Sequence, residues 1–354
     1  MTEAATHTWP HLLTSLLSGG DLSAAETSWA MRQIMSGDAA PTQIAGFLVA
    51  LRAKGETVTE LRALADVMLE HARPITVSGP TLDIVGTGGD MAGTVNISTM
   101  SSIAIAATGV RVVKHGNRAA SSKSGSADVL EALGVTLSLP TESVAGIAEQ
   151  AGITFCFAQA FHPSFRHTAI PRRDLGIGTA LNVLGPMTNP ARPTFSVVGV
   201  ADERVAPLMA GVFAQRGTHA LVFRGDDGLD ELTVADGSHV WWVADGAVTE
   251  VHITPEQLGL ARSPLHSLRG GDAQQNAEVA RRLLAGERGP VRDAVVLNAG
   301  AAVALAQAGP GVPADPIAAI RTGMDTIETV LDSGRAADLL ARWVAATAQD
   351  QATD

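Results

Sequence analysis

Apolar side chains in the first seventy residues recur at the spacing of amphipathic helices. The pattern predicts helices over residues 22–36, 41–53 and 57–72. Two of these helices begin with a hydroxyl residue that is followed three positions later by a glutamate, the spacing of a capping box: Ser23 with Glu26 and Thr57 with Glu60. The stretch carries no residues arranged for chemistry, so we interpret it as a helical domain or a dimerisation surface.

From residue 81 onward, short apolar runs alternate with helical patterns. The apolar runs predict strands at residues 81–85, 110–113 and 135–139, and the segments between them predict helices at 98–108 and 126–133. This β-α-β-α-β order is the unit of a parallel sheet with helices on its faces.

The rest of the chain extends this architecture. Further strands are predicted at residues 153–157, 194–200 and 219–223, and a two-stranded ribbon at 239–253 turns at Asp245 and Gly246. Helical patterns dominate again from about residue 272. The predicted fold class is therefore α/β, with a small N-terminal helical domain and a large α/β domain that has a mainly parallel central sheet and C-terminal helices.

The composition narrows the class of protein. Hydrophobic residues make up 46% and charged residues 17% of the 354 positions, which is typical of a globular protein. The formal net charge of -11 argues against sequence-independent binding of duplex nucleic acid, which needs a broad basic face. We find no signal peptide at the start of the chain and no apolar run near the roughly 20 residues of a membrane span. The single cysteine, Cys156, lies in the apolar run ITFCFA, so we expect it to be buried and the protein to be cytoplasmic.

Two candidate binding loops follow the first two predicted strands. The first, GTGGD at residues 86–90, has three glycines in four positions, and glycine lets a ligand approach bare backbone N–H groups. The second begins KHGNR and carries Lys114, Arg118 and Lys123 among small residues and serines. Ligands of an open parallel sheet bind at the carboxyl ends of the strands, so we expect both loops to face one crevice.

Each loop leads into a predicted helix N-terminus, where free N–H groups favour an anion. Asn96, Ser98 and Thr99 open the first helix, and a serine run ending at Ser126 opens the second. Together these donors suit several phosphate oxygens. Either loop alone is also explained as a tight connection with solvated serines and surface charges, and neither matches GxGxxG or GxxxxGK[ST].

An acidic segment, RGDDGLDELT at residues 224–233, follows the predicted strand 219–223. It places four carboxylates in six positions: Asp226, Asp227, Asp230 and Glu231. Mg²⁺ prefers one or two carboxylates together with phosphate and water oxygens, so Asp230 and Glu231 with the Ser98 hydroxyl are candidate ligands. A solvated acidic turn is the alternative. No CxxC or HExxH spacing indicates zinc.

A third group of polar residues lies in residues 161–190. Its donors suit a carboxylate, because arginine can grip one with two hydrogen bonds: His162, Arg166, His167, Arg172 and Arg173. Phe161 and Phe165 offer a surface for a flat ring. An ordinary loop and helix with surface arginines is the alternative interpretation.

Taken together, these motifs resemble those of the anthranilate phosphoribosyltransferase family in order and spacing. The matching segments between residue 83 and about residue 233 are GTGGD, NIST, KHGNRAASSKSGSADVLEALG, RRDLGIGTALNVLGPMTNP and GDDGLDE. GGDAQQNAEVARRLLAG and RDAVVLNAG extend the likeness toward the C-terminus, so it covers nearly the whole chain.

The resemblance implies a fold of the nucleoside phosphorylase and phosphoribosyltransferase type. The helical domain would cover residues 1–72 with a contribution from about 162–188, and the α/β domain would cover 73–161 and 189–354. The implied enzyme is usually a homodimer through its helical part. It transfers the phosphoribosyl group from 5-phosphoribosyl 1-diphosphate to the amine of anthranilate and releases diphosphate, in tryptophan biosynthesis. This chemistry needs no covalent nucleophile on the enzyme.

The resemblance also implies the binding residues. Those for phosphoribosyl diphosphate are Gly86, Gly89, Asp90, Thr94, Asn96, Ser98, Thr99, Lys114, His115, Gly116, Asn117, Arg118, Ser121, Ser122 and Ser126. Those for anthranilate are Gly86, Asn117, His162 and Arg172. Those for Mg²⁺ are Ser98, Asp230 and Glu231.

Four positions depart from the family pattern. Met91 follows Asp90 where the family usually has glycine, which affects the shape of the first loop. Phe165 stands where a tyrosine is often found, and Gly178 and Leu181 replace bulkier residues. We expect activity to survive and acceptor specificity to be the property most affected, so that either anthranilate or a substituted relative is the acceptor.

Two other functions stay open at this point. A pyrimidine nucleoside phosphorylase is expected to share the fold, and a non-catalytic relative could bind nucleic acid in the same crevice. The pair Asp230 and Glu231 and the KHGN loop favour a diphosphate donor over inorganic phosphate, and the net charge of -11 opposes nucleic acid.

Overall fold

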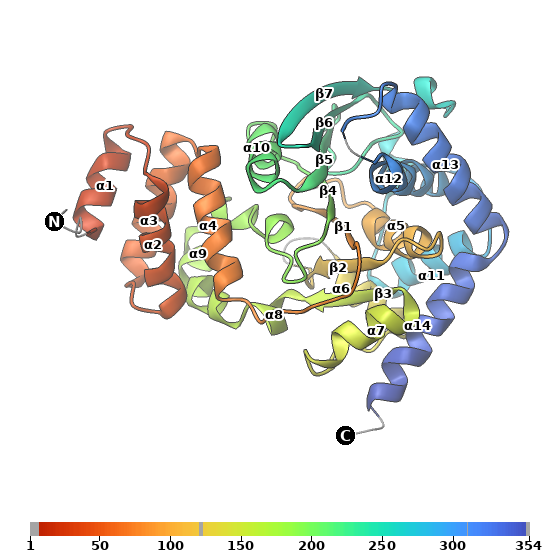
Figure 1. Cartoon of the computed structure of the whole chain (residues 1–354), viewed down its shortest axis with the longest axis horizontal. Coiled ribbons are helices and arrows are strands. Elements are labelled where there is room, and N and C mark those ends of the chain that lie inside the picture. The colour runs from red at the N-terminus through yellow and green to blue at the C-terminus, as the bar shows by residue number, and fades with distance from the viewer. Residues whose placement is uncertain (1–6, 120–122, 310, 352–354) are drawn as a thin grey trace.

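A helical bundle lies beside a larger α/β body in the computed structural model, which describes residues 7–119, 123–309 and 311–351 (Figure 1). The bundle helices are α1 (Trp9–Leu17), α2 (Ala24–Ser36), α3 (Pro41–Lys54) and α4 (Val58–Glu70). Both predicted capping boxes are formed, by Ser23 with Glu26 and by Thr57 with Glu60. The helices predicted from apolar spacing are confirmed.

A seven-stranded sheet forms the centre of the larger body. Its order is β3-β2-β1-β4-β5-β6-β7, in which the first five strands are parallel and the last two antiparallel. The strands are β1 (Leu82–Gly86), β2 (Val112–Gly116), β3 (Ile153–Phe157), β4 (Phe195–Gly199), β5 (His219–Gly225), β6 (Ser238–Ala244) and β7 (Ala247–Ile253). The mainly parallel sheet and the terminal ribbon confirm the predicted fold class, and the ribbon turns at Asp245 (φ 51°) and Gly246 (φ 74°).

Helices cover both faces of the sheet. They are α5 (Ile97–Ala106), α6 (Ser126–Ala132), α7 (Ser143–Ala151), α10 (Ala206–Arg216), α11 (Ala273–Leu284), α12 (Pro290–Gln307), α13 (Pro316–Asp332) and α14 (Arg335–Gln351). Two shorter helices, α8 (Ala158–Phe161) and α9 (Ala169–Leu175), lie between β3 and β4 in the chain. Short 3₁₀ helices occur at Pro163–Thr168, Ala180–Asn182, Gly185–Met187, Glu256–Leu258 and Leu265–Leu268. None of the helices in the described ranges combines the length and apolarity that crossing a bilayer requires.

Alternate strand residues divide the core between the two faces, because successive side chains of a strand point in opposite directions. Val197 and Leu221 pack in one cluster with α5 and α11 to α14. Val198 and Val222 pack in the other cluster with α10 and the bundle helices. The core of the bundle is thus continuous with one face of the sheet, and α9 adds to the bundle by packing against α3.

Two predicted elements differ from the structure. Residues 135–139 form no strand; the N–H of Thr136 instead donates to Thr347 Oγ1 on α14 at 3.2 Å. The chain takes its place at the edge of the sheet only afterwards, as β3 beside β2. In addition, Lys114, His115 and Gly116 belong to β2 and not to the following loop, and the side chains of Lys114 and His115 are buried there.

The expectation for Cys156 is confirmed. The thiol is buried within β3, and this burial raises its pKa well above the usual value. A small hydrophobic role in the core follows, not that of a nucleophile.

Candidate active site

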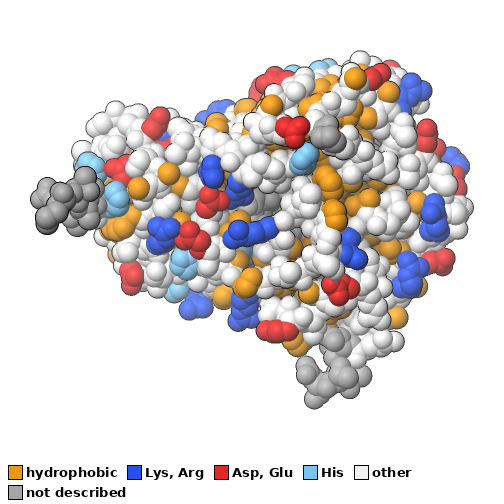
Figure 2. Space-filling view, viewed as in Figure 1, with side chains coloured by type: hydrophobic (Ala, Val, Ile, Leu, Met, Phe, Trp, Pro, Cys, Tyr) orange, Lys and Arg blue, Asp and Glu red, His pale blue; other side chains and the backbone are white. Residues whose placement is uncertain are grey.

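One large cavity of about 1030 Å³ lies at the carboxyl ends of β1, β2, β4 and β5. The chain order reverses between β1 and β4, and ligands of open α/β sheets bind at such a reversal. The space-filling view shows the surface hollowed between the bundle and the α/β body, with Lys and Arg side chains near the rim (Figure 2). The two predicted loops and the acidic segment all contribute to its wall.

The loop after β1 is built from left-handed backbone. Gly88, Gly89 and Gly93 have φ angles of 71°, 90° and 63°, which glycine adopts without steric cost. Met91 shares this conformation at φ 57°, and its side chain is 95% exposed. At this departure from the family pattern, Met91 thus takes a conformation that glycine adopts readily and places its side chain in solvent.

Asn96 connects the two loops at the start of α5. Its Nδ2 donates to the carbonyl of Ser124 at 3.2 Å, and its Oδ1 accepts from Asn276 Nδ2 at 2.8 Å. Asn276 in turn accepts from the N–H of Gly271 at 2.8 Å. The sequence reasoning assigned no role to Asn276, and only its place in the GGDAQQN motif pointed to it.

Lys114 is buried in β2 beneath the first loop. Its Nζ donates to the carbonyl of Ile84 and lies 3.2 Å from Ser98 Oγ. Burial lowers the pKa of Lys114, while the carboxylates of Asp83 and Glu231 act in the opposite direction. Lys114 is therefore held in a fixed position at the floor of the cavity, where the charges of Asp83 and Glu231 act on it.

Asp83 is a buried partner that the sequence reasoning missed. It accepts from the N–H of His115 at 3.1 Å and from Asn189 Nδ2 at 2.9 Å. Burial raises the pKa of Asp83 to about 6 although Lys114 and these donors favour the ionised form. The sequence does contain one signal for this role, a single carboxylate inside the apolar run TLDIV. A buried charge needs partners, so such a carboxylate indicates a buried polar contact.

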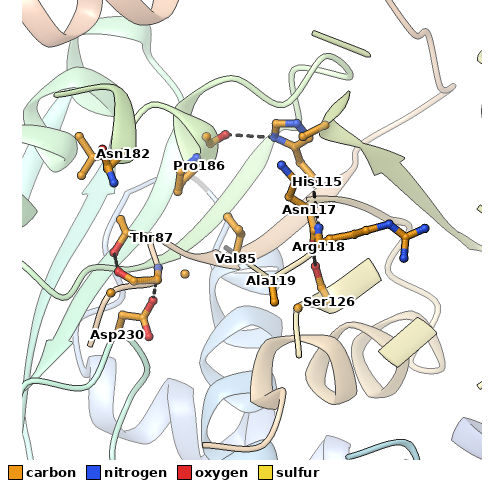
Figure 3. Close-up of a pocket in the computed structure, with 18 of the residues that line it drawn as sticks. Val85, Thr87, His115, Asn117, Arg118, Ala119, Ser126, Asn182, Pro186 and Asp230 are labelled. Atoms are coloured by element: carbon orange, nitrogen blue, oxygen red, sulfur yellow. Dashed lines mark hydrogen bonds between the residues drawn. The ribbon is translucent and has the colours of Figure 1, made fainter. Parts of the chain in front are cut away.

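Arg118 does not point into the cavity as a free cation. Its guanidinium pairs with Asp128 at 3.1 Å and with Glu131, both on α6, and these carboxylates raise its pKa. Figure 3 shows Arg118 extending away from the side where Thr87 and Asp230 lie. Lys123 is exposed and does not line the cavity. The expected basic crevice is therefore less basic than the KHGNR motif indicated.

Two carboxylates after β5 hold the loop and helix that follow β1. Asp230 Oδ2 accepts from the N–H of Gly88 at 2.6 Å, and Glu231 Oε1 accepts from the N–H of Ser98 at 3.1 Å. Burial and then the neighbouring Asp90 raise the pKa of Asp230 to about 7. Burial and the charge of Asp230 also raise the pKa of Glu231 well above its usual value.

Two glycines allow Asp230 to lie close to the ends of β1 and β4. A Cβ on Gly86 would overlap the carboxylate of Asp230, and a Cβ on Gly199 at the end of β4 would overlap the backbone of Asp230. Gly199 was not among the predicted site residues, because its role depends on a neighbour far away in the chain. The alternative of a solvated acidic turn is excluded for Asp230 and Glu231, which are 9% and 7% exposed, whereas Asp226 and Asp227 of the same segment are exposed.

The other end of the cavity contains histidine, arginine and phenylalanine. The rings of His115 and His162 lie 5.1 Å apart, and burial lowers their pKa values to about 3 and about 4. The Arg172 guanidinium lies 5.0 Å from the ring centre of Phe165, and burial lowers its pKa. Among the described residues no carboxylate pairs with Arg172, so a ligand with a carboxylate would satisfy it.

The cavity brings nearly all described site residues together. Those that line it are Gly86, Gly89, Asp90, Thr94, Asn96, Ser98, Lys114, His115, Gly116, Asn117, Arg118, Ser126, His162, Arg172, Asp230 and Glu231. Thr99 does not: it is fully buried one residue beyond Ser98. Ser121 and Ser122 lie outside the described residues. Gly178, Leu181 and Phe165, three of the four departures, also line the wall.

Family models match almost the whole chain. The model described as "Glycosyl transferase family, helical bundle domain" matches residues 10–72, and "Glycosyl transferase family, a/b domain" matches residues 78–337. An anthranilate phosphoribosyltransferase of Nocardioides sp. is 60% identical over 97% of this chain and 99% of its own length. One from Arthrobacter sp. is 59% identical over 98% and 97%.

Solved structures have the same fold. The crystal structure of anthranilate phosphoribosyltransferase from Thermus thermophilus superposes with a TM-score of 0.87 at 44% identity, covering 95% of this chain and 99% of that one. The Saccharomyces cerevisiae enzyme in complex with PRPP and Mg superposes with a TM-score of 0.87 at 25% identity, covering 96% and 98%.

Proposed function

The chain belongs to the anthranilate phosphoribosyltransferase family, and we propose that it performs that reaction: transfer of the phosphoribosyl group from 5-phosphoribosyl 1-diphosphate to the amine of anthranilate, with release of diphosphate. This is the second step of tryptophan biosynthesis from chorismate. The observation that carries the proposal is the convergence of the glycine loop, Lys114 and the buried carboxylates Asp230 and Glu231 in one cavity.

The phosphoribosyl diphosphate would bind between the two loops. The first loop presents bare N–H groups at Gly89 and around Asp90, and the side chains of Asn96 and Ser98 line the cavity at the start of α5. On the opposite wall Asn117 and Ser126 supply polar groups (Figure 3). We assign Gly86, Thr94, His115, Gly116, Arg118, Thr99, Ser121 and Ser122 to this donor site on family resemblance.

The residues around Asp230 fit Mg²⁺. Two buried carboxylates stand next to Asp90, and their raised pKa values indicate that a cation is needed to balance them when all are ionised. Asp230, Glu231 and the Ser98 hydroxyl would hold the ion, which matches the preference of Mg²⁺ for oxygen ligands. When bound, Mg²⁺ supplies positive charge to the leaving diphosphate.

Anthranilate would occupy the end of the cavity that contains Arg172. Its carboxylate would meet the Arg172 guanidinium, which lacks a carboxylate partner among the described residues, and its ring would lie near Phe165. Burial keeps His162 neutral at pH 7, so it can accept or donate a hydrogen bond without adding charge. Gly86 and Asn117, which also line the cavity, complete the assigned contacts.

The reaction requires alignment and charge stabilisation. Loss of diphosphate from C1 of the ribose leaves a cation-like sugar, as in glycoside hydrolysis. Fixed N–H donors and Lys114 stabilise the charge that develops on the leaving group, and the acceptor pocket aligns the amine. An aromatic amine is neutral near pH 7, so no strong base is needed to free its lone pair.

The domain boundaries, the assembly and the location are further parts of this proposal. We assign residues 1–72 with about 162–188 to the helical domain, and 73–161 with 189–354 to the α/β domain. A homodimer through the helical domain is supported by exposed apolar residues there: Leu17 on α1 is 79% exposed and Val49 on α3 is 40% exposed. A cytoplasmic location is supported by the reduced, buried Cys156.

A turnover assay tests the proposed function. Anthranilate is fluorescent, so its signal should fall when phosphoribosyl diphosphate and Mg²⁺ are added to the protein. Absence of turnover with saturating substrates would overturn the proposal, and phosphate-dependent release of base from thymidine or uridine would establish the phosphorylase alternative instead. Titrating substituted anthranilates in the same assay identifies the preferred acceptor.

A further inference from the structure

A second cluster of potential metal ligands lies at the end of the sheet formed by β5, β6 and β7, which is opposite the end that contains β3. Asp226, His239 and His252, all exposed, each offer one ligand atom, and these atoms lie within 4.8 Å of one another. His252 Nε2 is 2.9 Å from Asp226 Oδ2, and His239 Nε2 is 3.5 Å from Asp226 Oδ1. The two imidazole rings are 4.8 Å apart.

The fold builds this cluster from three adjacent strands. His239 on β6 and His252 on β7 are directly opposite each other in the antiparallel register, so their side chains project from the same face. Asp226 follows the last residue of β5, and its N–H donates to the carbonyl of Gly237 at 2.8 Å. Figure 1 shows β5, β6 and β7 together at one end of the sheet.

Gly237 leaves the space that the cluster occupies. A Cβ at this position would lie 2.5 Å from Asp226 Oδ2 and 2.7 Å from both Cε1 and Nε2 of His252. A side chain there would push the carboxylate and the imidazole apart. The close approach of the three groups therefore depends on a residue without a side chain.

We propose that Asp226, His239 and His252 form a surface site for a divalent transition-metal ion such as Zn²⁺. Two imidazole nitrogens and one carboxylate oxygen are ligands of this class of ion, whereas Mg²⁺ prefers oxygen. Metal–ligand distances of about 2.0–2.2 Å place neighbouring ligand atoms roughly 3.3 Å apart, which small side-chain rotations reach from the observed positions. Water would complete the coordination at this exposed site.

The nearby arginines leave the site available to a cation. Arg224 pairs with His239 in the strand register, but its guanidinium donates to the carbonyls of Ala201 at 2.9 Å and Gly225 at 3.2 Å. Arg262 pairs with Asp236 at 2.8 Å and with Glu256 at 2.7 Å. Arg262 is thus paired with carboxylates outside the cluster, and the Arg224 guanidinium is held by backbone carbonyls and not by Asp226.

A bound ion would stabilise the segment that carries the proposed Mg²⁺ ligands. Residues 226–237 leave the sheet at Asp226 and return at Gly237, and Asp230 and Glu231 lie between these two points. A metal bridge from Asp226 to β6 and β7 closes this segment at its base. The ion acts on stability and not on the chemistry of the cavity.

The test measures Zn²⁺ binding to the untagged full chain by isothermal titration calorimetry in excess Mg²⁺, which occupies the carboxylate site. We expect one Zn²⁺ per chain in the unmodified protein. His239→Ala and His252→Ala should each weaken Zn²⁺ binding at least about tenfold. A loss of this size already occurs when a residue that only hydrogen-bonds to a metal ligand is replaced. Thermal melting should show a Zn²⁺-dependent rise in Tm that both variants lose.

His11→Ala is the matched control, because His11 also faces a surface carboxylate, Glu26 at 3.4 Å, but belongs to no cluster of three potential ligands among the described residues. It should bind Zn²⁺ like the unmodified protein. Melting without metal verifies that the variants fold. Absence of Zn²⁺ binding, or equal affinity in the unmodified protein and in His239→Ala and His252→Ala, would falsify the proposed site.

Discussion

The carboxylate of Asp230 accepts a hydrogen bond from the backbone N–H of Gly88 at 2.6 Å, although 142 positions separate the two residues. This bond joins the segment after β5 to the glycine loop after β1, across the intervening strand β4. The loop is therefore already positioned by its acidic neighbour without a ligand. The same carboxylate is a proposed Mg²⁺ ligand, so loop position and metal binding depend on one side chain.

Replacing Asp230 by asparagine separates these two roles. Asp230→Asn keeps an oxygen that can accept from Gly88 but removes the charge, so thermal stability should change little while the apparent affinity for Mg²⁺ in the turnover assay falls at least about tenfold. Asp227→Asn is the control, because Asp227 accepts from Thr233 Oγ1 at 2.7 Å outside the cavity. Unchanged Mg²⁺ dependence in Asp230→Asn would remove Asp230 from the metal site.

Lys114→Met should weaken donor binding and lower stability together. The substitution keeps most of the length of the side chain but removes the cation that acts on the buried carboxylate of Asp83, and leaving a buried charge uncompensated costs about 3 kcal/mol. The Michaelis constant for phosphoribosyl diphosphate and chemical denaturation measure the two effects. Lys123→Met, at an exposed position outside the cavity lining, should change neither quantity.

Met91 gives a prediction about backbone conformation. Its side chain is in solvent but its φ is 57°, so the loop depends on a left-handed residue and not on a thioether contact. Met91→Gly and Met91→Asn, which tolerate this conformation, should retain the donor Michaelis constant. Met91→Val, which is β-branched, should raise it and lower stability by about 1 kcal/mol. Equal behaviour of the glycine and valine variants would contradict this explanation.

Local signals explain which parts of the fold were predictable. The capping boxes at Ser23 and Thr57 and the turn at Asp245 and Gly246 involve residues within four positions of each other, so the sequence displays them directly. The segment 135–139 has the alternation of a strand but is paired with none of the described strands, because β3 fills the position beside β2. Strand pairing is a non-local property that alternation alone does not determine.

The same distinction applies to the cavity. The glycine loop and the carboxylates at Asp230 and Glu231 were visible as compact motifs. The contributions of Asp83, Gly199 and Asn276 were not visible, because each acts through a partner distant in the sequence; Asn276 and Asn96 are 180 positions apart. The sequence pattern predicts a loop from Lys114 onward, whereas the structure has Lys114 inside β2, where the buried Asp83 favours its ionised form.

Arg172→Ala should raise the Michaelis constant for the acceptor while leaving that for the donor nearly unchanged. The lost charge-assisted hydrogen bonds contribute about 1.5–3 kcal/mol, which corresponds to roughly 10- to 100-fold. Arg173→Ala is a matched control on the same helix, since Arg173 is 75% exposed and pairs with Asp174. If the two variants had equal acceptor kinetics, anthranilate would have to bind elsewhere.

The buried histidines predict how stability depends on pH. The folded-state pKa of His162 is about 4, below its ordinary value of 6.5, so between these values the unfolded chain binds more protons and stability falls as pH decreases. At pH 5 the loss from His162 is about 2 kcal/mol relative to neutral pH. His115, with a pKa of about 3, acts in the same direction.

His162→Gln isolates this contribution from opposing groups. Asp83, whose pKa rises to about 6 on folding, retains protons between about 4 and 6 and so opposes the histidines in the same window. Subtracting the denaturation free energies of the His162→Gln variant from those of the unmodified protein cancels this background. The difference should fall by about 2 kcal/mol from pH 7.5 to pH 5. The exposed His266 is the control, and a His266→Gln variant should follow the unmodified protein at every pH. A pH-independent difference for His162→Gln would mean that the His162 ring accepts a proton in the folded protein as readily as in the unfolded chain.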